Sequence, residues 1–356
     1  MSWEYVALGE LYEVHNGLSK GGKFFGKGSP FLSFSTVFNK WFLPQELLDL
    51  VQSTDNEQQS YSILRGDVFV TRTSETMDEL GMSSVALKDY PHATYNGFTK
   101  RLRPINPERI LPEFIGYYLR TAVFRAGFTA FSTMTTRASL RNEDLLSMKV
   151  PVPDMQAQKH IASILSAYDD LVESSQKQIK LLEEAAQRLY KEWFVDLRFP
   201  GHETTPIVDG IPDGWEIQTL SQIADVVMGQ SPKSEFYNQD RQGLPFHQGV
   251  GSYGTRFVID TTYSTSFTRI AEAGSILFSV RAPVGRLNIT KNKIVIGRGL
   301  AAINHRSGMQ SYLFYLLKER FFKDNIIGNG AIFASISKDE LLGQKFIVPV
   351  DDLVKR

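Results

Sequence analysis

The stretch "GWEIQTLSQIADVVMGQSPK" at residues 214–233 reads like the start of a domain, although it lies past the middle of the 356-residue chain. It resembles "SWEYVALGELYEVHNGLSK" at residues 2–20. Four identities recur at a constant spacing of 212 residues (215 − 3): Trp3 and Trp215, Leu8 and Leu220, Gly17 and Gly229, Ser19 and Ser231. A constant spacing over four positions indicates an internal repeat, a feature to be tested before any other.

Three further pairs of segments follow in the same order. They are "GSPF" at 28–31 with "GLPF" at 243–246, "GDVFVTR" at 66–72 with "GSILFSVR" at 274–281, and "ASLRNEDLLSMK" at 138–149 with "ASISKDELLGQK" at 334–345. The spacing falls to 196 residues between Leu145 and Leu341, so the second copy is 16 residues shorter (212 − 196). Loop deletions account for such a difference. In this alignment Arg72 and Arg281 occupy equivalent positions.

Each copy mixes short strands with helices. The apolar runs that end "GDVFVTR" and "GSILFSVR" follow a turn and predict buried strands. Residues 112–128 and 310–324 have helical spacing, with a proline suited to a first turn in the first copy. Residues 142–149 and 338–345 predict a short helix before a final strand, whose prolines indicate a sheet edge. The fold class is therefore α+β, with two tandem domains at 1–153 and 201–350.

A long helix separates the copies, over 154–200, and Pro200 and Gly201 are expected to stop it. Steps of three and four residues run through it without a break, which is a heptad pattern typical of a coiled coil. About 38 helical residues would span about 57 Å. This helix has two interpretations. It is either a helix in the core of a single domain, or a helix with an apolar seam that a partner helix must cover. The apolar seam consists of Ile161, Leu165, Tyr168, Val172, Ile179, Leu182, Leu189 and Trp193.

The composition excludes several classes of protein. The chain has no cysteine, so disulfides, thiolate metal sites and thiol nucleophiles are excluded. No apolar run is long enough to span a membrane, and no signal peptide is visible, so we expect a cytoplasmic protein without membrane contact. The formal net charge is zero, which argues against a uniformly basic surface but permits a local basic face.

This organisation resembles the specificity subunit of type I restriction–modification systems. The resemblance covers nearly the whole chain and rests on the combination of two α+β domains, their Trp-Glu-x(3)-Leu openings and the long helix. The end of that helix, "WFVDLRFPG" at 193–201, is similar to the family's central region. So is its beginning, which contains Pro151, Pro153, Gln158, Ile161, Ile164, Leu165 and Asp169.

The resemblance implies a DNA-reading scaffold without catalysis of its own. Each α+β domain would be a target recognition domain that reads one half of a split, asymmetric site. The helix would set the spacing and dock the modification subunits, and a restriction subunit would complete the complex. The chain would bind no cofactor or metal itself; S-adenosylmethionine, ATP and Mg²⁺ would be bound by the partner subunits.

The sequence departs from the resemblance after residue 350. The family carries a second long helical region there, paired antiparallel with the first, whereas residues 351–356 are only the start of such a region. We therefore expect another chain to cover the seam of the helix, including a second copy of this one.

No segment of the sequence predicts a catalytic site. Adenine methyltransferase tetrapeptides and phosphate-binding loops are absent, and the six histidines lack the spacing of metal ligands. The "GVGSYG" segment at 249–254 matches a dinucleotide-binding pattern, but a strand-like segment follows it where a helix is required. The "DDLVESSQK" segment at 169–177 combines acids with a lysine as nucleases do, yet it lies in the long helix, where a solvated face is the simpler interpretation.

A protein that reads DNA needs cations to contact the phosphates, and arginine, asparagine or glutamine side chains to contact the base edges. Polar, Gly-rich segments of both copies offer them, and the alternative for each residue is a solvated charge or an internal ion pair. We weight Arg72 and Arg281 most. The full set is Lys20, Lys23, Arg72, Thr73, Ser74, Arg137 and Arg141 in the first copy, and Lys233, Arg241, His247, Arg256, Arg281, Arg286 and Arg298 in the second.

Other functions remain open at this point. The repeated domains and the helix could form a scaffold that binds only protein, and an enzyme in its own right is disfavoured by the missing catalytic residues. The reading part of a fused nuclease–methylase is a further possibility. The methylated sequences in a host that expresses the chain with a modification subunit would separate these functions.

Overall fold

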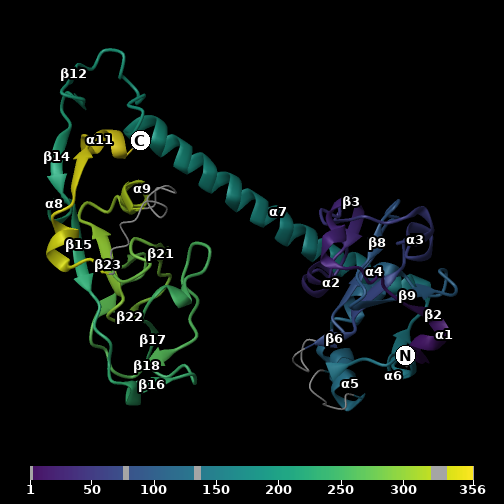
Figure 1. The fold of residues 1–356 in the computed structure, drawn as a ribbon. Helices are drawn as coiled ribbons and strands as arrows, with labels where there is room; N and C mark the ends of the chain where they lie inside the picture. The colour runs from purple at the N-terminus through teal and green to yellow at the C-terminus, as the bar shows by residue number, and fades with distance from the viewer. Residues whose placement is uncertain (1–2, 75–79, 132–137, 322–334, 356) are drawn as a thin grey trace. The chain divides into compact units, whose positions relative to one another are not determined.

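The computed structural model describes residues 3–74, 80–131, 138–321 and 335–355, and the chain divides into two compact units, 1–177 and 178–356. The boundary falls inside α7 (Met155–Phe194), a helix of 40 residues, so each unit includes part of this helix (Figure 1). The sequence predicted the helix as a separate segment, with boundaries at 154 and 200. We describe the two units one at a time.

Unit 1 contains a four-stranded antiparallel sheet in the order β2-β9-β5-β7 and a three-stranded sheet in the order β4-β3-β8. The pairs β1–β11 and β6–β10 complete it. Its strands are β1 (Glu4–Ala7), β2 (Tyr12–Asn16), β3 (Phe25–Leu32), β4 (Leu50–Val51), β5 (Val68–Thr71), β6 (Thr73–Ser74), β7 (Ser83–Val85), β8 (Thr94–Tyr95), β9 (Thr99–Pro104), β10 (Ala138–Ser139) and β11 (Lys149–Val152). Its helices before α7 are α1 (Leu8–Leu11), η1 (Gly22–Phe24), α2 (Phe34–Asn39), α3 (Asp55–Ser60), α4 (Pro112–Tyr118), α5 (Ala122–Phe131) and α6 (Asn142–Ser147).

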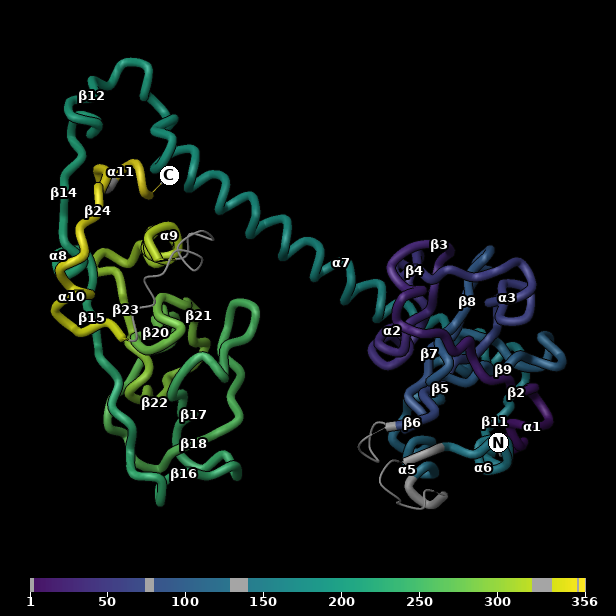
Figure 2. Tube along the Cα trace, in the orientation of Figure 1, coloured from purple at the N-terminus to yellow at the C-terminus, as the bar shows by residue number. Residues whose placement is uncertain are grey.

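Unit 2 contains a four-stranded sheet in the order β15-β23-β20-β21 and a five-stranded sheet in the order β16-β18-β17-β22-β19. The pairs β12–β13 and β14–β24 complete it, and Figure 2 shows β14 and β24 side by side. Its strands are β12 (Ile207–Val208), β13 (Ile211–Pro212), β14 (Glu216–Thr219), β15 (Ala224–Met228), β16 (Tyr237–Asn238), β17 (Leu244–His247), β18 (Tyr263–Ser264), β19 (Ile270–Ala271), β20 (Ile276–Ser279), β21 (Leu287–Ile289), β22 (Ile294–Ile296), β23 (Leu300–His305) and β24 (Lys345–Val348). Its other helices are α8 (Leu220–Ile223), η3 (Ser234–Phe236), η4 (Val250–Ser252), α9 (Gln310–Phe321), α10 (Lys338–Leu342) and α11 (Asp351–Val354).

The two units share one topology, as the repeat predicts. The sheet β2-β9-β5-β7 matches β15-β23-β20-β21, and the pair β1–β11 matches β14–β24. The parallel pair β3–β8 likewise matches β17–β22. Every residue of β5 and of β20 is buried, so the two strands predicted from "GDVFVTR" and "GSILFSVR" are confirmed.

The hydrogen-bond register corrects one predicted equivalence. The backbone N–H of Arg72 donates to Phe98, and the N–H of Val280 donates to Gly299 at the matching place in unit 2. Arg281 therefore corresponds to Thr73, one residue further along than predicted. Because side chains alternate between the two faces of a strand, a shift of one residue moves a side chain to the other face.

The helix predicted over 112–128 is in fact two helices. α4 ends at Tyr118 and α5 begins at Ala122, where the hydroxyl of Thr121 accepts a hydrogen bond from the N–H of Phe124 at 3.3 Å. Threonine competes with helix continuation by bonding the backbone in this way. In unit 2 the matching helix α9 is continuous from Gln310 to Phe321.

The long helix is confirmed, but it ends at Phe194, six residues before Pro200. Beyond Phe194 the chain turns through Leu197, which has a φ of 56°, and Phe199 then packs on Trp215 with the ring centroids 5.1 Å apart. At the other end of the helix, the carboxylate of Asp154 accepts a hydrogen bond from the N–H of Ala157, which caps the first turn.

Candidate nucleic-acid interface

Four chain segments meet at one end of the main sheet of unit 1. The N–H of Gly17 donates to the carbonyl of Thr99 at 3.2 Å, and the N–H of Arg72 donates to that of Phe98 at 3.0 Å. The N–H of Leu140 in turn donates to the carbonyl of Arg72 at 2.9 Å. The segments 17–20, 72–74, 96–99 and 139–141 are thus neighbours, although the sequence presents them as separate loops.

This end of unit 1 carries three cations. Arg72 is half-buried, Arg141 is exposed and bonded to Asp144 at 2.9 Å, and Lys100 on β9 is buried. The ammonium group of Lys100 donates to the amide oxygen of Asn142. Burial lowers the pKa of Lys100, and the nearby charge of Arg72 lowers it further. Sequence reasoning missed Lys100; a lysine within the otherwise buried run "TKRL" was the available signal.

The same end of unit 2 is built from matching segments. The N–H of Gly229 donates to the carbonyl of Leu300 at 2.9 Å, and that of Ile336 donates to the carbonyl of Val280 at 2.9 Å. The exposed residues Arg281 and Arg298 lie here, and the N–H of Arg298 donates to the hydroxyl of Ser231 at 3.2 Å. The structure therefore brings together two predicted arginines that are 17 residues apart (298 − 281).

The turns that match between the units present different side chains at this end. Unit 1 has Asn96, Gly97 and Phe98 before β9, and the ring of Phe98 is 56% exposed. Unit 2 has Gly297, Arg298 and Gly299 before β23. An exposed aromatic ring in one unit thus stands one position from where the other unit carries an exposed guanidinium group.

The other predicted residues of unit 1 have varied surroundings. The ammonium group of Lys20 is 2.7 Å from the carboxylate of Glu57 and is mostly buried, so its charge is already paired. Lys23 is exposed and lies over the ring of Phe24. Thr73 is in β6, which pairs with β10. The side chain of Ser74, and all of Arg137, lie outside the described residues.

In unit 2, Lys233 and Arg241 are exposed. Lys233 directly precedes η3, and Arg241 lies shortly before β17. Lys233 stands 3.9 Å from Glu235, an exposed pair that contributes little to stability. Neither residue is joined by a hydrogen bond to the segments that carry Arg281 and Arg298 in the part of the chain that the structure describes.

His247 is not available to DNA in this structure, because its side chain is fully buried. One ring nitrogen, Nδ1, is 2.7 Å from the hydroxyl of Ser252, and the other, Nε2, is 2.9 Å from the carboxylate of Asp260. Burial lowers the pKa of His247, while the hydrogen bond to Asp260 opposes that shift. These are the residue types of a hydrolase triad, but the buried ring leaves no room for a substrate. The network holds the segment 247–260 in place.

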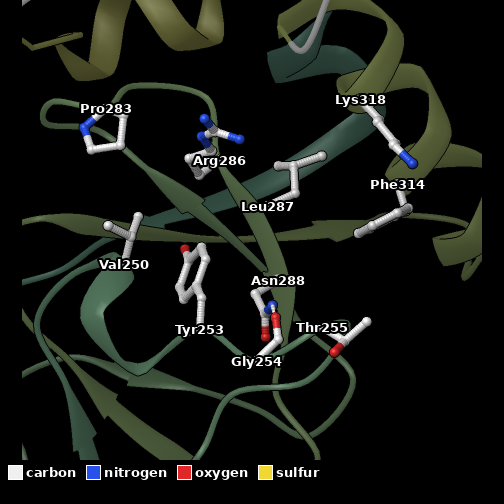
Figure 3. A pocket seen from close by; sticks show the side chains of 10 residues that line it. All are labelled: Val250, Tyr253, Gly254, Thr255, Pro283, Arg286, Leu287, Asn288, Phe314 and Lys318. Carbon is white, nitrogen blue, oxygen red and sulfur yellow. Dashed lines mark hydrogen bonds between the residues drawn. The ribbon is translucent and has the colours of Figure 1, made fainter. Parts of the chain in front are cut away.

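Unit 2 contains a cavity of about 390 Å³ with Arg286 in its wall (Figure 3). The guanidinium group of Arg256 is 3.2 Å from the carboxylate of Glu183 on α7 and lies over the ring of Phe314. Arg286 lines the cavity, together with Lys318 of α9. Arg286 ends the β20–β21 turn that also carries Arg281, and the N–H of Ser279 donates to its carbonyl at 2.9 Å. The "GVGSYG" segment forms η4 beside the same cavity, with no α-helix after it.

The seam of α7 has two kinds of surroundings. Near the beginning, Ile161 packs on the core of unit 1, and near the end, Trp193 packs with Phe199 and Trp215. These ends need no partner helix. Between them, the apolar side chains of the seam are exposed to water in each unit: Leu165, Tyr168, Val172, Ile179, Leu182 and Leu189.

No group of three or more histidine or carboxylate side chains in the described ranges could hold a metal ion. Among the helices described, none combines the length and apolar character needed to cross a membrane.

Comparisons with known proteins agree with this architecture. The family model described as "Type I restriction modification DNA specificity domain" matches residues 1–184 and 212–352. A putative type I restriction enzyme specificity subunit, MjaX, from Methanocaldococcus jannaschii is 29% identical over 98% of this chain and 83% of its own length. The MjaIX specificity subunit of the same organism is 25% identical over 76% of this chain and 66% of its own length.

A crystal structure of the type I restriction–modification S subunit from M. genitalium has a similar fold. Its TM-score is 0.61 at 14% identity, over 99% of this chain and 87% of that one. Because the family model spans both units, the chain belongs to the type I restriction–modification DNA specificity family, and its role is that of a sequence-recognition subunit.

Proposed function

We propose that each unit reads one half of a bipartite, asymmetric DNA target with the sheet end that carries Arg72, Lys100 and Arg141 in unit 1, and Arg281 and Arg298 in unit 2. Cations on converging segments suit the phosphates that fix a protein on the duplex. The chain itself is non-catalytic in this proposal. S-adenosylmethionine, ATP and Mg²⁺ are bound by the modification and restriction subunits with which it assembles.

One observation carries the proposal: the two units have the same backbone at this end but different side chains on it. An exposed arginine suits O6 and N7 of guanine, whereas an exposed ring such as Phe98 suits the methyl group of thymine. Equivalent turns that present Phe98 in one unit and Arg298 in the other are expected to read different half-sites.

The test is the set of methylated sequences in a host that expresses the full chain with a modification subunit. We expect one new split motif. Replacing Arg298 by Ala should relax one position in one half of the motif, with a loss of about 1–3 kcal/mol in binding if Arg298 contacts a base. The matched control, Phe98→Ala, should change only the other half. A methylome unchanged by the wild-type chain would contradict the proposal, as would an equal effect of both variants on both halves.

The exposed seam of α7 supports the assembly part of the proposal. Apolar side chains at heptad spacing stabilise a pair of helices when a partner helix buries them. The modification subunits, or α7 of a second copy, supply that partner. Replacing Val172 and Leu182, both exposed, by Asp should abolish assembly with the modification subunit while leaving each unit folded. The alternative of self-pairing is tested on the chain alone, where light scattering at micromolar concentration should show a dimer; a strict monomer would exclude it.

A further inference from the structure

The cavity in unit 2 lies where unit 1 has the helix α2. Its walls come from η4 and the residues after it, from the β20–β21 turn with β21, and from α9 (Figure 3). The parallel pairs β3–β8 and β17–β22 make Leu32 equivalent to His247, so residues 33–40 correspond to 248–255. The first segment forms α2 with six residues and packs on β5 and β7. The second forms only the three residues of η4 and then an extended bridge between Tyr253 and Val258.

Unit 1 fills this place further with the side chain of Arg120. The residues before it on α4 are buried at the same spacing as those before Lys318 on α9, so the two positions match. The guanidinium group of Arg120 donates to four backbone carbonyls at 2.6–3.1 Å, and burial lowers its pKa to about 10. The acceptors are the carbonyls of Val37, Phe38, Lys40 and Ser83. In unit 2, Lys318 instead donates to the amide oxygen of Gln187 on α7 at 3.0 Å.

The two charged residues in the lining of the cavity are both cations, Arg286 and Lys318. None of the lining residues that the structure describes is acidic. A cavity lined by charges of one sign attracts the opposite charge, so this one favours an anionic ligand. Arg286 has another interaction as well, so we assign the direct contact with the anion to Lys318. An ammonium group has three hydrogens, so Lys318 can bond Gln187 and a ligand together.

Two buried polar atoms of the wall have no hydrogen-bond partner among the described residues. Asn288 is 2% exposed; its amide nitrogen donates to the carbonyl of Gly254 at 2.8 Å, whereas its amide oxygen is unpaired. The hydroxyl of Tyr253 is the second atom, and burial raises its pKa, so it remains protonated and can donate. Buried polar atoms are normally satisfied, so the oxygen of Asn288 indicates a ligand with an N–H donor.

The charged and the neutral parts of the lining lie apart. In Figure 3 the charged ends of Arg286 and Lys318 lie above Asn288, with the rings of Tyr253 and Phe314 at levels between them. The volume of about 390 Å³ is within the range of about 300–1,000 Å³ that is typical of small-molecule sites. A ligand that matches this lining has an anionic group, a flat ring and an N–H donor. A nucleotide has all three, whereas inorganic phosphate has only the first.

We propose that the cavity beside α9 in unit 2 binds a nucleotide. The phosphate would accept hydrogen bonds from the ammonium group of Lys318. The base would lie against the ring of Phe314, and one of its N–H groups would donate to the amide oxygen of Asn288. The nucleotide is either a free mononucleotide or an unpaired nucleotide of a DNA strand. The second source rests on the proposed function, because the β20–β21 turn carries Arg281 as well as Arg286.

Calorimetric titration of the full chain with each of the four deoxynucleoside monophosphates tests the proposal. We expect one site per chain for at least one of them. Deoxyribose 5-phosphate lacks the base and the matching deoxynucleoside lacks the phosphate, so each should bind at least about tenfold more weakly. No binding of any of the four nucleotides, or equally tight binding of deoxyribose 5-phosphate, would overturn the proposal.

A pair of variants on α9 makes the result specific to the cavity. Lys318→Met removes the ammonium group at nearly constant size, so nucleotide binding should weaken at least about tenfold, to near that of the deoxynucleoside. The matched control is Arg320→Gln, an exposed cation of the same helix that bonds Gln344 and does not line the cavity. This control should bind as the wild type does. An equal loss in both variants would indicate attraction to positive charge in general and contradict the proposal. Thermal unfolding verifies that unit 2 is folded in both.

Two DNA duplexes distinguish the sources of the nucleotide. One carries a single unpaired nucleotide, and the other has the same sequence fully paired. Tighter binding of the first duplex by the wild type, lost in Lys318→Met, assigns the site to a DNA strand. Equal affinity for both duplexes, together with mononucleotide binding, assigns it to a free nucleotide. The mononucleotide titration needs no target sequence, so its failure is distinct from a failure of the proposed function, which the methylated motif reports.

Discussion

The two units have the same strand order and register, but they bury different side chains at equivalent positions. Where unit 1 buries Leu32 and Val37, unit 2 buries His247 and hydrogen-bonds it to Ser252. Where unit 1 has Gly116 against Phe42, unit 2 has Phe314 beside an open cavity. Backbone ladders fix the positions of the strands in both, so a side chain can be replaced as long as its own contacts are satisfied. The pairs that differ most are the places to test that rule.

The largest expected difference concerns the tryptophans of the repeat. Trp215 is 7% exposed and packs with Phe199 and Leu353, whereas Trp3 is 45% exposed. Trp215→Ala should lower the free energy of unfolding of unit 2 by about 3–5 kcal/mol. Trp3→Ala should change that of unit 1 by about 1 kcal/mol or less. Urea unfolding followed by hydrogen exchange assigns each loss to its unit; equal losses would mean that the two residues are not differently buried in solution.

Arg120 and Lys318 should differ next. Arg120→Ala leaves several buried carbonyls without a donor, and we expect a loss of about 3 kcal/mol in unit 1. Lys318→Ala removes one exposed hydrogen bond and should cost about 0.5 kcal/mol. Chemical denaturation of the two variants, compared with the wild type, measures both values. A loss as large for Lys318 as for Arg120 would show that unit 2 also depends on its cation at this position.

For Gly116→Ala, the prediction concerns the sign of the change in the stability of unit 1. A side-chain carbon added to Gly116 would lie 2.3 Å from the ring of Phe42, so Gly116→Ala should destabilise unit 1 by about 1–3 kcal/mol. Glycine to alanine within a helix is otherwise favourable by about 0.5–1 kcal/mol. The urea midpoint decides between the two signs, and the double variant with Phe42→Leu should recover part of the loss.

The smallest expected effect is the pH dependence of unit 2. The pKa of His247 is lowered in the folded state, so the unfolded state binds more protons near pH 6.5. The stability from the neutral ring is complete above about pH 6.5 and decreases as the pH falls, by at most about 1.4 kcal/mol per pH unit. The double variant His247→Leu, Ser252→Val carries the pair found in unit 1 and should lose this slope. Unfolding measured between pH 5 and 8 provides the comparison, and an unchanged slope would assign it to another group.

Much of the fold could be predicted from the sequence, because it depends on periodicity. The repeat of Trp3 and Trp215, the apolar runs that became β5 and β20, and the heptads of α7 are patterns that can be read along the chain. The prediction was wrong where the structure depends on a single residue. Thr121 divides the predicted helix of unit 1, and the register makes Arg281 equivalent to Thr73 instead of Arg72. A periodic signal does not report a shift of one residue between copies of different length.

The candidate site was predictable in type but not in arrangement. Arg281 and Arg298 were recognised as suited to DNA, and the structure places them on neighbouring segments. His247 and Lys20 have the same general character in the sequence, yet one is buried and the other is paired with Glu57. Lys100 was missed because a buried lysine is rare and its partner Asn142 is 42 residues away.

The sequence by itself determined two repeated α+β domains, a long helix between them and the type I specificity family, because these follow from patterns along the chain. Only the tertiary structure decided which cations share a surface and which are neutralised inside a unit. The physical reason is distance: a charge acts on what lies within a few ångströms of it, and the fold sets those neighbours.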